Sequence, residues 1–179
     1  MRFDGGHILV LSGSPGAGKS TVAAAIARMP GSRKVHLHTD DFWAFIKRGL
    51  IDPWLPEAAQ QNKTVMAVAA AAADRYASGG YFVIVDGVVG PWFVDAFARL
   101  TAPMHYVILR TTLEEAIGRC QRRGGSTLSD PTVVGELHAQ FSNMGRFEAN
   151  VLDVSGQTPE EALAGVHLAL NSGQFLLSE

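Results

Sequence analysis

One eight-residue segment, residues 13–20 with the sequence GSPGAGKS, restricts the fold of this chain more than any other feature. It matches the pattern G-x-x-x-x-G-K-[ST], follows the apolar residues 8–12 and precedes the alanine-rich residues 21–29. A buried strand, a glycine-rich turn and a helix in this order form a loop whose backbone N–H groups surround phosphate oxygens. The segment therefore predicts a phosphate-binding loop between a strand and a helix.

The residue types in this loop suit a nucleotide. Glycines permit backbone angles that other residues avoid and leave room for a phosphate group. Lys19 is placed to reach the β- and γ-phosphates, and the Ser20 hydroxyl can ligate Mg²⁺. We expect ATP or GTP, together with Mg²⁺, to be held by Gly13, Ser14, Pro15, Gly16, Ala17, Gly18, Lys19, Ser20 and Thr21.

Short apolar or β-branched runs alternate with longer stretches of helical period along the rest of the chain. The further strands are expected at residues 34–39, 81–85, 105–110 and 150–154. The further helices are expected at residues 55–77, 91–100, 113–123 and 132–144, followed by a last helix that Thr158 caps. This alternation predicts an α/β fold with βαβ units around a mostly parallel sheet. Because no repeat or linker interrupts it, we expect residues 1–179 to form a single domain, with a peripheral tail after Asn171.

Composition argues against several classes of protein. Hydrophobic residues make up 47% of the chain and charged residues 18%, values typical of a folded globular protein. The net charge of −2 gives no basic field to attract nucleic acid. No apolar run approaches the roughly 20 residues that cross a bilayer, the N-terminus lacks the pattern of a signal peptide, and Cys120 is the one cysteine. We therefore expect a cytoplasmic protein without membrane or nucleic-acid partners.

Acidic residues follow two of the expected strands, where open α/β sheets bind ligands. Asp40 could orient and deprotonate an acceptor hydroxyl; Asp41 is a rival, and a third interpretation is that the pair only caps the next helix. Asp86 ends an apolar run in the Walker B manner and could hold Mg²⁺, although a turn-forming Asp-Gly is the alternative. Since no Glu follows Asp86, kinase chemistry is favoured over mechanical ATPase chemistry.

Arginines are concentrated on the helix expected at residues 113–123. Arg119 and Arg123 are four residues apart and therefore share a helix face, and Arg122 lies beside them. They could clamp a transferring phosphoryl group, or they could be solvated surface charges. Arg110 also ends a strand, but it could equally pair with Glu114.

Aromatic and histidine side chains give weaker indications. Aromatic residues after the two acidic strand ends could form the apolar wall of a small-molecule pocket or could pack in the core; they are Trp43, Phe45, Trp54 and Trp92. The histidines show no metal-ligand spacing, two of them alternate within a strand, and we assign none to catalysis; they include His36, His38, His105 and His138.

With these motifs, the chain resembles the P-loop kinases, and in particular the small-molecule group that includes chloramphenicol phosphotransferase, zeta toxin and gluconate kinase, which are AAA-type ATP-binding phosphotransferases. The resemblance implies a three-layer P-loop NTPase fold with a five-stranded sheet, helices on both faces and a small lid at about residues 119–135. It matches Asp40 to the acidic position after the second strand and implies lid arginines next to a joint at Gly124-Gly125. It also implies that residues 153–156 touch the base, and it favours ATP.

These observations predict an ATP-dependent kinase that phosphorylates a hydroxyl group of a small molecule. Lys19, Asp40, Arg119 and Arg123 are the expected catalytic residues, and Ser20 and Asp86 are the expected Mg²⁺ residues. Two alternatives stay open: a nucleotide-binding regulatory ATPase or switch without a small-molecule acceptor, and a polynucleotide end kinase.

Overall fold

The computed structural model describes residues 5–97, 100–123 and 128–177 of the chain. At its centre is a sheet in which β1 to β5 are parallel, in the order β2-β3-β1-β4-β5, and β6 pairs antiparallel with β4. The strands are β1 (Ile8–Gly13), β2 (Lys34–His38), β3 (Phe82–Asp86), β4 (Met104–Arg110), β5 (Val151–Asp153) and β6 (Leu176–Leu177). The predicted mostly parallel sheet is confirmed.

The parallel strands are joined by helical connections. The α-helices are α1 (Lys19–Arg28), α2 (Thr39–Ala44), α3 (Ala59–Ser78), α4 (Pro91–Val94), α5 (Leu113–Arg123), α6 (Pro131–Ala139) and α7 (Pro159–Ser172). Two 3₁₀ turns, η1 (Pro56–Ala58) and η2 (Gly145–Asn150), precede α3 and β5. Among the described residues, no helix is both long enough and apolar enough to span a bilayer.

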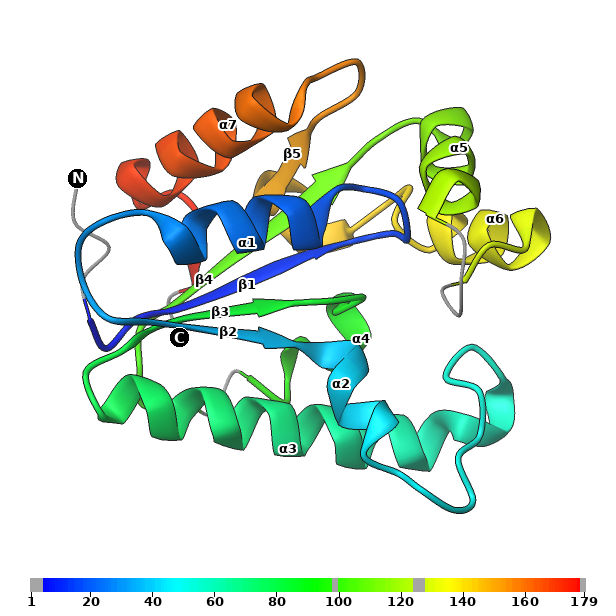
Figure 1. Ribbon diagram of the computed structural model, residues 1–179, viewed down its shortest axis with the longest axis horizontal. Helices are drawn as coiled ribbons and strands as arrows, with labels where there is room; N and C mark the ends of the chain where they lie inside the picture. Colours follow the sequence, from blue (N-terminus) through cyan, green and yellow to red (C-terminus); the bar gives the residue numbers. More distant parts are fainter. Residues whose placement is uncertain (1–4, 98–99, 124–127, 178–179) are drawn as a thin grey trace.

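The sheet separates two apolar layers because successive side chains of a strand point to opposite faces. In β1, Leu9 and Leu11 pack in the layer under α1 and α7, whereas Ile8 and Val10 pack in the layer over α3. Figure 1 shows α1 and α7 on one side of the sheet and α3 on the other. All four of these β1 side chains are buried, which explains why the strand reads as a continuous apolar run. The three-layer α/β fold is therefore confirmed.

The structure corrects three details of the expected fold. Beyond the five predicted strands, the described residues include β6, and Phe175 beside it is buried against α1 and α7, so the tail after Asn171 is not peripheral. The helix expected at residues 91–100 is a single turn, α4, and residues 98–99 lie outside the described part. The helix expected from Thr132 to Met144 ends at Ala139.

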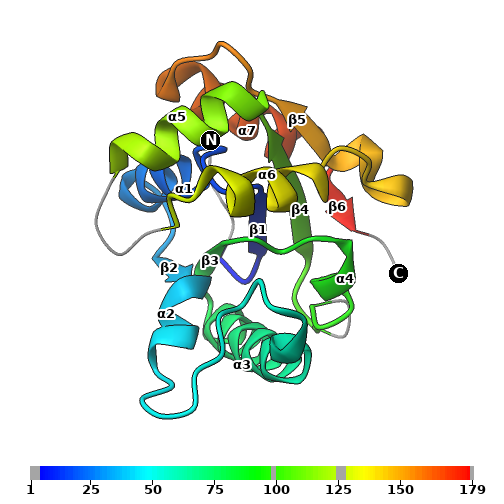
Figure 2. The ribbon, with the colours of Figure 1, turned by 90° about the vertical axis from the view of Figure 1, so that its right-hand side faces the viewer.

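The parallel strands all end at one edge of the sheet, which faces the viewer in Figure 2. There α2, α4, α5 and α6 surround the ends of β1, β3 and β4. Residues that directly follow these strands are brought together at this edge, although they are far apart in the sequence. The fold therefore gathers the predicted site residues in one region.

Candidate active site

The loop between β1 and α1 has the conformation that phosphate binding needs. Gly13 and Gly16 have φ angles of 141° and 77°, values that L-residues rarely adopt. A Cβ at Gly13 would overlap the backbone oxygen of Leu109 in β4, and a Cβ at Gly16 would overlap that of Ala116 in α5. Backbone from two neighbouring elements therefore holds the loop closely on both sides, and only glycine fits at these two positions.

Lys19 lies inside this loop. Its Nζ donates a hydrogen bond of 2.8 Å to the backbone oxygen of Ser14, and the side chain is buried. Burial lowers the pKa of Lys19 to about 8, while Asp86 and Asp40 act in the opposite direction. An anion in the loop would therefore meet a cation that is poorly solvated, which strengthens their attraction. The glycine positions and this cation fit the triphosphate of a nucleotide.

Asp86, at the end of β3, is the most fully hydrogen-bonded carboxylate of the site. Its Oδ2 accepts a 2.6 Å bond from the Ser20 hydroxyl, and its Oδ1 contacts His36 Nε2 at 2.6 Å and His38 Nδ1 at 3.0 Å. Burial raises the pKa of Asp86, but hydrogen bonds from His36, His38 and Ser20 outweigh it and leave the pKa well below the ordinary value. The charged carboxylate fits a Mg²⁺ site. Because both Asp86 oxygens already have protein partners, Asp86 would hold the ion indirectly, by orienting the Ser20 hydroxyl or a water molecule that ligates it.

The register of the sheet explains the two histidines. His36 and His38 are two residues apart in β2, so they project from the same face, and His38 pairs directly with Asp86 across the parallel β2–β3 ladder. This face is the one covered by α1, where Ser20 lies. Sequence reasoning assigned these histidines no role, and their alternation within a strand was the one signal that could have found them.

Asp40 lies in the first turn of α2, directly after β2. Its Oδ2 is 3.4 Å from His38 Nε2, and this contact is the main cause that lowers the pKa of Asp40. The side chain is 73% exposed and is therefore accessible to a ligand. The rival, Asp41, is in the same turn and exposed, and its carboxylate does not share the His38 contact within the described part of the chain. Asp40 is thus the carboxylate that His38 links to Asp86.

Two small residues bring α2 against the end of β3. Thr39 is completely buried, and a Cβ at Gly87 would overlap its side chain. Because Gly87 lacks a Cβ, the start of α2 can approach the residue that follows Asp86. The Asp86-Gly87 sequence therefore serves close packing here, next to the carboxylate.

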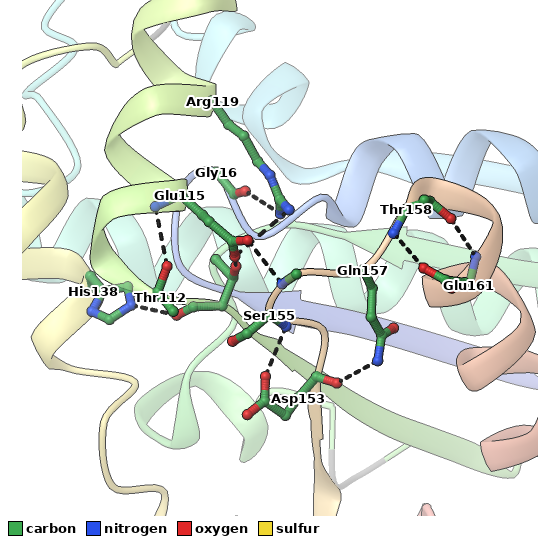
Figure 3. A network of polar contacts seen from close by, with 12 residues as sticks. Gly16, Thr112, Glu115, Arg119, His138, Asp153, Ser155, Gln157, Thr158 and Glu161 are labelled. Atoms are coloured by element: carbon green, nitrogen blue, oxygen red, sulfur yellow. Dashed lines mark hydrogen bonds and ion pairs between the residues drawn. The ribbon is translucent and has the colours of Figure 1, made fainter.

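Arg119 reaches the phosphate-binding loop from α5. Its Nη1 donates a 3.4 Å bond to the backbone oxygen of Gly16, and its Nη2 lies 3.8 Å from Glu115 Oε2 (Figure 3). Arg123, one turn further along α5, is exposed and near enough to Lys19 to lower its pKa. The structure thus brings Arg119 into contact with the loop and Arg123 near Lys19, whereas the predicted joint at Gly124-Gly125 lies outside the described residues.

Glu115 connects α5 with the loop after β5, and sequence reasoning missed it. Its Oε1 accepts a 2.8 Å bond from the backbone N–H of Gly156, and its Oε2 accepts a bond from the Thr111 hydroxyl. Ser155 is held in turn by a 2.8 Å bond from its N–H to Asp153 Oδ1 (Figure 3). The residues that the family resemblance assigned to base contact are therefore tied to the same helix that carries Arg119.

Arg110 does not belong to the phosphate site. Its guanidinium forms a bidentate pair with Glu148, at 2.6 and 3.0 Å, and its Nε donates a 3.1 Å bond to the backbone oxygen of Phe141. The suggested pairing with Glu114 is wrong. Arg110 instead holds η2, through Glu148, and the segment after α6, through Phe141, against the end of β4.

The four aromatic residues do not form one pocket wall. Trp43 is buried in the core, where its Nε1 donates a 2.9 Å bond to Asn62 Oδ1. Trp92 contacts Phe141 edge to face, whereas Phe45 contacts Phe42. Phe45 also lines a groove of about 380 Å³ between α2 and α3, together with Phe42, Ile46, Gln61, Thr64, Val65 and Val68. Trp54 is exposed and does not line this groove, and neither does any residue of the phosphate-binding loop.

Comparison with known proteins agrees with this geometry. A family model described as an AAA domain matches residues 9–140. No curated protein sequence matches the chain.

Several solved structures share the fold over nearly their whole length. A sugar kinase from Janibacter sp. HTCC2649 is 19% identical, with a TM-score of 0.70 and coverage of 92% of this chain and 94% of that one. The tunicamycin resistance protein of Deinococcus radiodurans is 15% identical, with a TM-score of 0.67 and coverage of 96% and 98%. A gluconokinase from Sinorhizobium meliloti 1021 is 21% identical, with a TM-score of 0.61 and coverage of 96% and 97%. The predicted resemblance to P-loop kinases is confirmed for the fold.

Proposed function

We propose, from the premise that this chain belongs to the AAA domain family, that it is a kinase which transfers the γ-phosphoryl group of Mg-ATP to a hydroxyl group of a small molecule. The observation that carries the proposal is the hydrogen bond between Ser20 and Asp86 beside the buried Lys19, with Asp40 linked to Asp86 through His38. Two of the structures that share the fold are a sugar kinase and a gluconokinase, which supports a small-molecule acceptor.

The phosphate-binding loop would hold the triphosphate by its backbone N–H groups and by Lys19. The loop needs little rearrangement for this, since Gly13 and Gly16 already have their unusual backbone angles. Lys19 would exchange its bond to the Ser14 oxygen for bonds to phosphate oxygens. Ser20 and Asp86 would hold Mg²⁺, which when bound offsets negative charge on the β- and γ-phosphates.

In the transfer itself, Asp40 would orient the acceptor hydroxyl toward the γ-phosphorus. The acceptor oxygen forms its bond to phosphorus as the bond from phosphorus to the β–γ bridging oxygen breaks, so that the electron pair leaves with ADP and the hydroxyl proton passes to Asp40. Because the His38 contact lowers the pKa of Asp40, the carboxylate stays charged and accepts a hydrogen bond from the hydroxyl from the start. Orientation is then the larger part of its task.

Arg119 and Arg123 would offset the charge that develops on the transferred group. Arg119 already lies against the loop through Gly16, and Arg123 projects from the same helix face one turn further. Cationic donors that are held in place before the reaction stabilise the charge that develops in the transition state. The proposal therefore assigns α5 an active part in transfer in addition to its contact with the loop.

The test is ATP binding by calorimetry together with ATP consumption in the presence of hydroxylated compounds, such as sugars, sugar acids, nucleosides and antibiotics. Lys19→Ala should lose nucleotide binding, while Asp40→Asn should bind ATP normally and transfer about 10²–10⁴-fold more slowly. Consumption of ATP that no compound stimulates would count against a kinase. Unimpaired transfer by Asp40→Asn would remove the role proposed for that carboxylate.

A further inference from the structure

His38 contacts both carboxylates of the candidate site. Its Nδ1 lies 3.0 Å from Asp86 Oδ1, and its Nε2 lies 3.4 Å from Asp40 Oδ2. His36 binds the same Asp86 oxygen at 2.6 Å, but within the described part of the chain it does not reach Asp40. Both imidazoles therefore contact Asp86, and His38 alone of the two also contacts Asp40.

The two carboxylates that His38 contacts differ in how freely their side chains can move. Asp86 is completely buried, and Ser20 and His36 fix its two oxygens independently of His38. Asp40 is largely exposed in the first turn of a six-residue helix, where a short carboxylate has several rotamers available. A rigid imidazole held by the fixed carboxylate can restrict the rotamers of the free one. The strand supplies the necessary precision because His38 is paired with Asp86 in the β2–β3 ladder.

We propose that His38 is a positioning residue for phosphoryl transfer: it uses the Mg²⁺-site carboxylate Asp86 as an anchor and sets the side-chain orientation of Asp40 toward the acceptor. This inference rests on the proposed function, because it assumes that Asp40 receives the acceptor hydroxyl. His38 itself takes up no proton from the substrate and touches no reacting atom. Its effect is to keep Asp40 near the geometry for attack, where misplacement by about 1 Å can cost on the order of 100-fold in rate.

The proposed role differs from a purely structural one, in which the two histidines would be equivalent. If the imidazoles served only to neutralise the buried Asp86, both would act on nucleotide and Mg²⁺ binding in the same way. The Nε2 contact of His38 with Asp40 adds a function on the acceptor side that His36 lacks. The two residues are therefore a matched pair for an experiment.

The substitutions can be chosen by ring position. Asn places its amide near the position of Nδ1, so His38→Asn keeps a donor for Asp86 and loses the contact with Asp40. Gln reaches the position of Nε2, so His38→Gln keeps a donor for Asp40. His36→Asn loses the Nε2 contact with Asp86 and serves as the control. Melting curves of the variants identify any that fail to fold. If His38→Asn does not fold, His38→Gln gives a second measurement.

The measurement is phosphate release from Mg-ATP, with water as the acceptor, by the full chain. His38→Asn should lower kcat about ten-fold with KM for ATP within about two-fold, and His38→Gln should recover only part of that loss, because its donor for Asp40 lacks the anchor on Asp86. When Asp40→Asn is already present, adding His38→Asn should lower kcat by less than about two-fold, because the effects of substitutions at residues that act through one another are not additive. His36→Asn, which alters the contact with Asp86 and not with Asp40, should change kcat and KM by the same factors whether or not Asp40→Asn is present.

The outcomes separate this inference from the proposed function. If Asp40→Asn is slow but His38→Asn turns over at the wild-type rate, the positioning role is wrong and the proposed function stands. If His38→Asn costs as much with Asp40→Asn as without it, His38 acts on Asp86 alone and the inference is overturned. If Asp40→Asn itself is unimpaired, that single variant shows that the assignment of Asp40 has failed.

Discussion

The backbone oxygen of Ala116, in α5, occupies the space that a Cβ at Gly16 would need. The phosphate-binding loop and the arginine-bearing helix are thus in direct contact through a residue that has no side chain. Arg119 strengthens the same contact by its bond to the Gly16 oxygen. A change in the loop should therefore also displace α5.

Gly16→Ala should unfold more easily than wild type and lose ATP binding. The substitution combines an unfavourable positive φ with an overlap against Ala116, so we expect a loss of more than about 2 kcal/mol in the free energy of unfolding. Gly18→Ala is the matched control, since Gly18 also has a positive φ, of 92°, but has no atom within 4 Å of its Cβ position. Urea unfolding and calorimetry measure both effects. Equal stability of the two variants would show that the contact with α5 contributes nothing.

Asp86→Asn should destabilise the folded chain as well as weaken Mg²⁺-dependent nucleotide binding. The substitution puts an amide donor in place of an oxygen that accepts hydrogen bonds from Ser20 or from the two histidines, in a fully buried position. Leaving buried donors without an acceptor costs about 1–3 kcal/mol. Chemical unfolding tests this, with Asp41→Asn as the exposed control that should stay within about 0.5 kcal/mol. A fully stable Asp86→Asn would contradict the importance of the hydrogen-bonded network.

Local sequence patterns were sufficient for the parts of the fold that depend on neighbouring residues. The GSPGAGKS segment predicted the strand, turn and helix that β1, the loop and α1 form, and the helix expected at residues 113–123 has those bounds as α5. Thr158 caps α7 as expected: its side chain accepts a bond from the Glu161 N–H, and its own N–H donates to the Glu161 carboxylate in return. Each of these features is decided within a few residues of chain, so the sequence expresses it directly.

Features that depend on distant pairing could not be read in this way. The meeting of His36 and His38 with Asp86 follows from the parallel register of β2 and β3, which no local pattern specifies. Arg110 pairs with Glu148, 38 residues away in the sequence, although Glu114 is much nearer in the sequence. The two-residue β6 is too short to show a period, and its pairing with β4 depends on how α7 returns the chain to the sheet.

Glu115→Gln should loosen the loop after β5 without unfolding the chain. The Gly156 N–H would lose its charged acceptor, and the Thr111 hydroxyl, which now donates to the second carboxylate oxygen, would face an amide NH₂ instead, because Gln offers one oxygen where Glu offers two. We expect faster hydrogen exchange at the Gly156 amide and ATP binding weakened several-fold, since a charge-assisted bond contributes about 1.5–3 kcal/mol. Glu114→Gln, next to it on the exposed surface of α5, should leave that amide unchanged. Unaltered exchange in Glu115→Gln would contradict the prediction.

His105 should make the stability of the chain depend on pH at the end of the sheet opposite the candidate active site. Burial and, to a lesser extent, the neighbouring His7 ring, 3.2 Å away between nitrogens, together lower the pKa of His105 to about 4. Between pH 6.5 and pH 4 the unfolded chain would carry a proton on His105 that the folded chain does not. Stability from this residue is therefore complete above about pH 6.5 and is lost progressively as the pH falls toward 4, with an upper limit of about 3 kcal/mol.

Urea unfolding of wild type and His105→Leu at a series of pH values between 4 and 7.5 measures this effect, because other titrating groups cancel in the difference between the two proteins. The wild type should lose stability relative to His105→Leu as the pH falls. His7→Ala should show an intermediate slope, since it removes the neighbouring ring but leaves the burial of His105. A difference that stays constant across the series would mean that His105 takes up its proton equally in the folded and unfolded chains.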